Sequence, residues 1–166
     1  MILTKQEIQK LIKEKKIILD PFDPSSITPA SIDLALGDKL RVFNSRNSKI
    51  DLSEELDYEK ITKEVDITDG FELEPGELVL GITKEKITLP ENVAGWLQSR
   101  SRFARIGLMS HITAPFIFPG VSNHQVLEIF NSGHQPIILR PGVRICQLIL
   151  EECQGEARYE GIFKDQ

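Results

Sequence analysis

The sequence has few cysteines and no long apolar run. Its 166 residues include two cysteines, Cys146 and Cys153. Two cysteines do not make the disulfide framework of a small secreted domain, so a reducing, cytoplasmic location is expected. No apolar run approaches the ~20 residues that cross a bilayer. The N-terminus, MILTKQEI, lacks the charged-then-apolar order of a signal peptide. We therefore expect no membrane partner.

Positive charge is also in short supply, except at one place. The 20 Lys and Arg residues are outnumbered by 25 Asp and Glu residues, and the net charge is −5. This balance argues against general nucleic-acid binding. Against that average, the chain places Arg100, Arg102 and Arg105 within six residues, next to Ser99 and Ser101. Guanidinium groups and backbone N–H groups at a helix start match phosphate oxygens, so this cluster predicts an anion site. A solvated surface turn is the alternative interpretation.

An acidic residue interrupts an apolar strand pattern shortly afterwards. The run QVLEIFN, residues 125–131, is typical of a strand, and alternation puts Val126, Glu128 and Phe130 on one face. A carboxylate on such a face is costly to bury unless it is paired or used. Glu128 is therefore a candidate general base. A position on a solvent face or a sheet edge is the alternative.

One helix is predicted, near the start of the chain. Residues 4–15 show apolar side chains at helical spacing, and Thr4 and Glu7 form the T-x-x-E pattern of a capping box. Residues 31–36 alternate polar and apolar up to Gly37-Asp38, and residues 40–43 resume the pattern, which predicts a β-hairpin. The charged segment 44–69 predicts a solvated surface loop with at most a helical turn.

The remainder of the chain has the pattern of an all-β protein. Short β-rich runs are separated by Pro-Gly pairs at 75–76, 119–120 and 141–142. Such spacing favours a sandwich or barrel over a βαβ fold. The length favours one domain, residues 1–166.

Several stretches together resemble a known family. SRSRFARIGL is followed by HITA, a PG turn and QVLEIFNSG, then by PIILRPGVRICQLIL, and is preceded by ITPASIDLALGDKL and FELEPGELVLGITKEKITLP. Their order and spacing resemble the dCTP deaminase family, within the dCTP deaminase/trimeric dUTPase superfamily. The resemblance covers about residues 27–166. It implies a mainly β fold, a distorted jelly-roll-like β-barrel of the dUTPase type with a short N-terminal helix. It also implies a homotrimer with active sites built between neighbouring subunits.

The resemblance also implies roles for the arginine cluster. Arg100, Ser101 and Arg102 would bind a nucleotide triphosphate, with Mg²⁺ held on the phosphates. Arg105 would lie near the catalytic carboxylate of Glu128 and hold it ionised. The match is imperfect, because the family's glycine before the first arginine is Ser99 here and its second serine is Arg102.

Further residues are implied to form the nucleotide pocket. His111, Thr113 and Ala114 match the segment that lines the pyrimidine. Tyr159, Phe163 and Gln166 match an aromatic–aromatic–Gln pattern in a C-terminal segment that folds over the nucleotide. Because the sequence stops at Gln166, this lid is expected to be shorter than in relatives with a Gly-rich continuation.

The implied reaction is the hydrolytic deamination of dCTP at C4 of the cytosine ring. Glu128 would take a proton from water and pass one to the ring nitrogen and the departing ammonia. Zinc deaminases use H-x-E and P-C-x-x-C motifs for this chemistry. The chain has no C-x-x-C, so we expect no zinc and no protein metal site.

Two other functions remain open at this point. One is a dUTPase, or a bifunctional enzyme that releases dUMP and pyrophosphate. The other is a non-catalytic β-barrel that binds nucleotide. Relatives that hydrolyse the triphosphate carry an Asp in the pattern I-D-x-G, which is also common in plain deaminases. The corresponding residues here are Ile117-Phe118-Pro119-Gly120. Because Phe118 cannot accept a proton, the sequence favours dUTP as the product.

Overall fold

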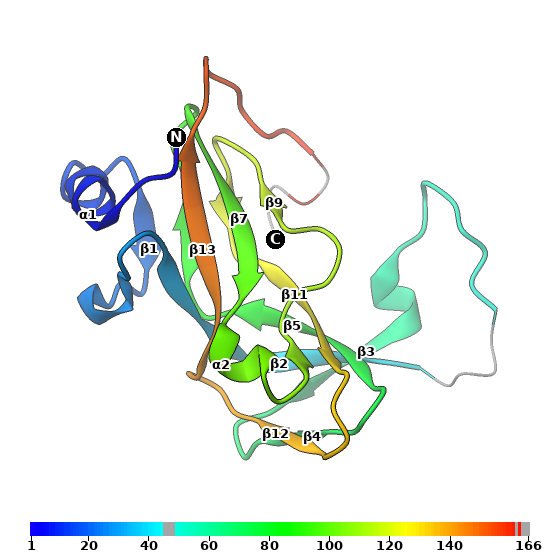
Figure 1. Ribbon diagram of the computed structural model, residues 1–166. Helices are drawn as coiled ribbons and strands as arrows, with labels where there is room; N and C mark the ends of the chain where they lie inside the picture. The colour runs from blue at the N-terminus through cyan, green and yellow to red at the C-terminus, as the bar shows by residue number, and fades with distance from the viewer. Residues whose placement is uncertain (45–48, 162, 164–166) are drawn as a thin grey trace.

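The computed structural model describes residues 1–44, 49–161 and 163, and most of its regular structure is strand (Figure 1). The principal sheet runs in the order β8-β11-β5-β2-β13-β7-β9, with β3 paired to β2. Its strands are β2 (Ile32–Phe43), β3 (Thr62–Asp66), β5 (Leu78–Thr83), β7 (Val93–Ser99), β8 (Leu108–Met109), β9 (Phe116–Ile117), β11 (Val126–Asn131) and β13 (Arg144–Glu152). The sheet curls into a half-barrel, which confirms the predicted mainly β, barrel-like fold.

Two smaller sheets complete the described structure. One has the order β1-β6-β10, and the other pairs β12 with β4. Their strands are β1 (Ile18–Asp20), β4 (Phe71–Leu73), β6 (Lys86–Thr88), β10 (Ser122–Asn123) and β12 (Ile137–Leu139). The helical elements are α1 (Lys5–Lys13), α2 (Ser101–Ala104) and the 3₁₀ turns η1 (Pro24–Ser26) and η2 (Tyr58–Ile61). None of the helices in the described ranges is long and apolar enough to cross a membrane.

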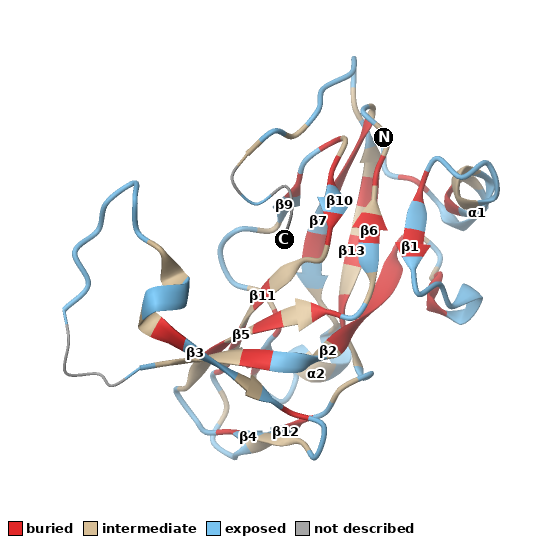
Figure 2. Ribbon diagram, turned by 180° about the vertical axis from the view of Figure 1, so that it is seen from behind, coloured by how far each residue is buried: buried red, intermediate tan, exposed pale blue. Residues whose placement is uncertain are grey.

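The apolar core lies inside the curled sheet. Alternate residues of β11 and β5 point inward, so Leu127, Ile129 and Val79 have no exposed surface. Figure 2 shows buried positions gathered along β2, β7 and β13, while α1 is mostly exposed. The face of β11 opposite the core carries Val126, Glu128 and Phe130, each partly exposed, as the alternation predicted.

The predicted hairpin around Gly37-Asp38 is wrong. Residues 32–43 form the single strand β2, whose first part pairs with β13 and whose later part pairs with β3 and β5. The register with β5 shifts between Leu36 and Leu40, so the Gly-Asp pair lies at a bulge. A Cβ on Gly37 would lie 3.1 Å from the Ile82 carbonyl oxygen. The glycine therefore permits close approach of two strands at a bend and does not form a turn.

The helix and the Pro-Gly turns largely match the predictions. Helix α1 begins after Thr4, but the Thr4 side chain makes no capping hydrogen bond, and Glu7 bonds to Lys10 at 2.8 Å. The expected capping box is therefore absent. The glycines of the three Pro-Gly pairs have φ between 70° and 78°, the left-handed conformation that suits glycine in a turn.

The segment predicted as a surface loop is only partly one. Residues 49–56 are exposed and extend away from the sheets (Figure 1). After them, η2 and β3 return to the barrel, where Thr62 and Ile67 are buried. The charged composition concealed β3 because an edge strand, here paired with β2 alone, can carry charged side chains in water. Residues 63, 64 and 66 of β3 are exposed.

Candidate active site

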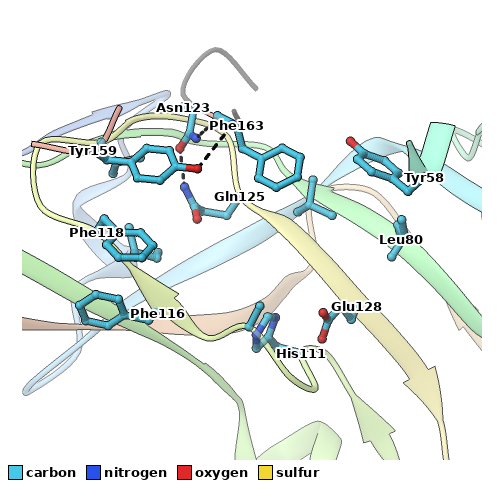
Figure 3. Close-up of a pocket in the computed structure, with 14 residues that line it drawn as sticks. Tyr58, Leu80, His111, Phe116, Phe118, Asn123, Gln125, Glu128, Tyr159 and Phe163 are labelled. Atoms are coloured by element: carbon cyan, nitrogen blue, oxygen red, sulfur yellow. Dashed lines mark hydrogen bonds between the residues drawn. The ribbon is translucent and has the colours of Figure 1, made fainter. Parts of the chain in front are cut away.

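A pocket of about 350 Å³ lies on the outward face of β11. Fourteen residues line it, contributed by five separate parts of the chain (Figure 3). They are Tyr58, Leu80, His111, Ala114, Phe116, Ile117, Phe118, Val121, Asn123, Gln125, Val126, Glu128, Tyr159 and Phe163. Apolar and aromatic walls with a few polar groups are typical of a small-molecule site.

The carboxylate of Glu128 is held by the loop that follows β8. Its Oε2 accepts hydrogen bonds from the backbone N–H groups of Thr113, at 2.6 Å, and Ile112, at 3.2 Å. Its Oε1 accepts a bond from the Thr113 hydroxyl at 2.8 Å. The loop can supply these N–H groups because it belongs to no strand ladder at these residues. Three donors therefore fix the orientation of the carboxylate.

These contacts also decide the charge of Glu128. Burial is the largest single influence and by itself would raise the pKa of this carboxyl. The hydrogen bonds from Thr113, the nearby His111 ring and the Ile112 N–H act in the opposite direction, and together they lower the pKa of Glu128 below its ordinary value. The group is thus an anion at neutral pH and is able to accept a proton.

His111 is the second polar group at this end of the pocket (Figure 3). Both ring nitrogens are buried, and neither has a hydrogen-bond partner among the described residues. Burial lowers the pKa of His111, although the nearby Glu128 charge opposes this effect. A neutral imidazole with one donor and one acceptor left over is costly to bury unless a bound molecule meets them. This supports the predicted place of His111 in a ligand pocket.

Aromatic rings and the C-terminal segment form the opposite wall. Phe118 stacks on Tyr159, with centroids 5.1 Å apart, and meets the edge of Phe116 at 5.0 Å. The Tyr159 N–H donates to the Pro119 carbonyl at 3.0 Å, and the Asn123 side-chain amide donates to the Phe163 carbonyl at 2.7 Å. Tyr159 and Phe163 are thus held against the pocket. Gln166, predicted to take part in this lid, lies outside the described residues.

Several lining residues were not predicted from the sequence. Tyr58 comes from η2, in the segment interpreted as a surface loop, and its ring lies 6.4 Å from that of Phe163. The signal that could have identified it is its rarity, since the chain has two tyrosines and this one stands among charged residues. Asn123 and Gln125 follow the Pro-Gly turn and point into the pocket together. No sequence pattern marked either of them.

The arginine cluster lies elsewhere in this chain. None of Arg100, Ser101, Arg102 and Arg105 lines the pocket. Arg100 forms an ion pair with the buried Asp33 at 2.9 Å and donates to the Arg144 carbonyl at 2.6 Å. Arg102 and Arg105 are exposed on and just after α2, with no ion pair to any described residue. Within one chain, the Thr113 and Ile112 hydrogen bonds and the His111 ring, and not Arg105, lower the pKa of Glu128.

No protein metal cluster is apparent in the described ranges. Within residues 1–44, 49–161 and 163, no three His, Cys, Asp or Glu side chains gather at metal-binding geometry. Cys146 and Cys153 are free thiols, and burial raises the pKa of Cys146 far above its ordinary value. The expected absence of zinc stays a prediction.

Comparison with protein families decides the classification. A family model described as "dCTP deaminase-like" matches residues 2–153. The chain belongs to the dCTP deaminase-like family. The resemblance noted in the sequence motifs is thereby confirmed. The prediction that residues 1–166 form one domain of this type stays a prediction.

Relatives of this family match along most of the chain. A protein named dCTP deaminase from Marinomonas sp. is 42% identical over 183 residues, covering 100% of this chain and 94% of its own. One named "dCTP deaminase, dUMP-forming" from Corynebacterium efficiens is 44% identical over 153 residues, covering 90% and 78%. The crystal structure of 2'-deoxycytidine 5'-triphosphate deaminase from Agrobacterium tumefaciens matches with a TM-score of 0.71 and 26% identity. That match covers 90% of this chain and 47% of the other.

The hydrogen bond from Thr113 makes a testable contribution to the charge of Glu128. In Thr113→Val the hydroxyl donor is lost and the shape is kept, so we expect the pKa of Glu128 to rise toward its ordinary value. Carbon-13 NMR titration of the Glu128 carboxyl in both proteins measures this. Because the folded-state pKa is lowered, the stabilisation linked to it is present at neutral pH and lost as pH falls through that pKa. An unchanged pKa in Thr113→Val would contradict the assignment.

Proposed function

We propose that this protein catalyses the hydrolytic deamination of dCTP to dUTP and ammonia. The observation that carries the proposal is the ionised Glu128 carboxylate, fixed by three donors inside an aromatic-walled pocket of nucleoside size. Membership in the dCTP deaminase-like family and the names of its relatives support the substrate and the reaction.

The geometry suits acid–base catalysis at the cytosine ring. With the ring between the aromatic wall and β11, C4 faces Glu128, which takes a proton from a water molecule as the oxygen attacks C4. Glu128 gives that proton to ring nitrogen N3. It then takes the proton of the new C4 hydroxyl and passes it to the exocyclic amine, so that the C4–N bond breaks, ammonia departs and the C4 carbonyl forms. Thr113 and the Ile112 N–H keep the carboxylate aimed throughout. His111 contributes a neutral donor and acceptor to the same end of the pocket.

The triphosphate site is proposed to lie between subunits. In one chain the arginines in and beside α2 are separate from the Glu128 pocket, and Arg102 and Arg105 have no acidic partner among the described residues. We propose a homotrimer in which Arg100, Ser101 and Arg102 bind the phosphates and Arg105 reaches the Glu128 of a neighbouring subunit. Mg²⁺ would be bound through the phosphate oxygens and water, as suits a hard cation. A cytoplasmic location, where the nucleotide pool lies, belongs to the same proposal.

Replacing Glu128 removes the proposed base. We expect Glu128→Gln to lower the deamination rate at least ~100-fold, the usual scale of general acid–base catalysis, while dCTP still binds. Ammonia release and isothermal titration measure the two effects. Glu72→Gln, at an exposed residue of β4 outside the pocket, is the matched control and should retain full activity. Normal turnover by Glu128→Gln would show that another group is the base. A wild-type protein that binds dCTP but forms no product would favour the non-catalytic barrel.

The products distinguish a deaminase from the bifunctional alternative. Relatives of both names are equally similar to this chain, so identity alone does not decide between them. At position 118 the pocket presents an aromatic ring stacked on Tyr159, which cannot activate water for attack on the α-phosphate. We therefore expect dUTP and ammonia from dCTP, separated by ion-exchange chromatography, and no conversion of dUTP. Stoichiometric dUMP from either substrate would establish the dUMP-forming activity instead.

If each active site combines residues of two subunits, two inactive variants should restore activity when they are mixed in one trimer. We expect Glu128→Gln and Arg105→Ala to be inactive separately. When the two variants are unfolded, mixed in equal amounts and refolded, about a quarter of the interfaces in random trimers combine an intact Glu128 with an intact Arg105. Recovery of about a quarter of wild-type activity is therefore expected. If both residues act within the same chain, the mixture remains inactive.

A further inference from the structure

The end of the pocket away from Glu128 holds a chain of side-chain amides (Figure 3). The Gln125 Nε2 donates to the Asn123 Oδ1 at 2.6 Å, and the Asn123 Nδ2 donates to the Phe163 carbonyl at 2.7 Å. A carbonyl oxygen can only accept, so the Asn123 nitrogen must face Phe163 and its oxygen must face Gln125. Gln125 must then turn its own nitrogen toward Asn123. Its Oε1 is consequently the end left over, and no described residue bonds to it.

The position of this oxygen is fixed by the fold. The Gln125 backbone N–H donates to the Thr83 hydroxyl at 2.9 Å, and its carbonyl accepts the Thr83 N–H at 2.9 Å. Thr83 is 1% exposed and Asn123 is 4% exposed, so both supports are buried. An acceptor held in this way is in place before a ligand arrives, which reduces the ordering cost of binding.

The place of Gln125 in the chain relates this acceptor to the reacting group. Gln125 directly precedes β11 and lines the same pocket as Glu128, three residues further on, which is about 10 Å for an extended chain. In a pyrimidine nucleoside the ring carbon C4 and the 3'-hydroxyl lie at opposite ends, and the long Gln125 and Glu128 side chains can approach these two ends. With C4 at Glu128, the sugar therefore lies near Gln125. The facing wall offers the rings of Phe116 and Phe118, which have no acceptor atoms.

We propose that the Gln125 Oε1 accepts a hydrogen bond from the 3'-hydroxyl of the deoxyribose and so selects nucleotides that carry this hydroxyl. The proposal rests on dCTP being the ligand, as argued above. The 3'-hydroxyl is the donor in question because it is the one free hydroxyl on the sugar of dCTP. Asn123 is a positioning residue that acts through Gln125, since it decides which end of the amide faces the ligand.

The test compares dCTP with 2',3'-dideoxycytidine triphosphate, which lacks that hydroxyl. Binding is measured by isothermal titration in a Glu128→Gln background, so that turnover does not intervene. We expect this parent to bind dCTP about tenfold more tightly than the dideoxy analogue, the scale of one hydrogen bond. Adding Gln125→Met, which keeps the length and removes the acceptor, should bring the two affinities to within about twofold. Gln125→Leu should do the same with a different side-chain shape.

The controls separate this proposal from the proposed function. Gln9→Met makes the same chemical change at an exposed position on α1 and should leave the preference unchanged. A parent that binds both nucleotides equally, or a Gln125→Met protein that keeps the preference, would overturn the role of Gln125. Wild-type protein is assayed for dUTP in parallel. If dCTP binds more tightly than the dideoxy analogue only when Gln125 is present, but the wild-type protein forms no dUTP, the deaminase proposal is overturned. The role of Gln125 in binding the 3'-hydroxyl would then still stand.

Discussion

The hydrogen bonds between the Glu128 carboxylate and the 112–113 loop are the constraint on which the site depends. A partly buried carboxylate on a sheet face needs donors, and the sheet cannot provide them, because its N–H groups are committed to neighbouring strands. The loop provides two backbone N–H groups and one hydroxyl. Binding the loop at this point places His111 beside the carboxylate and leads the chain on to Phe116 and Phe118. One charged side chain thereby fixes the loop that carries His111 and leads into the Phe116 and Phe118 wall.

The bend in β2 supplies the surface on which this arrangement is built. Because β2 pairs with β13 at one end and with β3 and β5 at the other, a single strand joins two halves of the curled sheet. The half that contains β5 also holds β11, and its outward face is the floor of the pocket. Tyr58 arrives from the segment before β3, and Tyr159 and Phe163 arrive from the chain end. The pocket exists only where these distant segments meet.

The buried Asp33 explains why the arginine cluster is not a uniform cationic patch. Burial raises the pKa of this carboxyl, and the charges of Arg100 and Arg144 oppose that effect. Arg100 is therefore a partner that a buried acid needs, and loss of one member of such a pair is costly. Arg102 and Arg105 form no ion pair with any acidic residue that the structure describes. The cluster thus divides into one guanidinium tied to the barrel and two directed outward.

Local residue patterns predict the mainly β class, the N-terminal helix, the three Pro-Gly turns and the face that Val126, Glu128 and Phe130 share. Each follows from a local period or from the conformational preference of glycine and proline, which neighbours in the chain suffice to express. The tertiary structure decided that Gly37-Asp38 bends one strand, that Tyr58 enters the pocket, and that Asn123 orients Gln125. It also decided that Arg100 pairs with Asp33, which is 67 residues away in the chain. These features depend on which distant segments meet, and alternation or turn signals carry no information about such meetings.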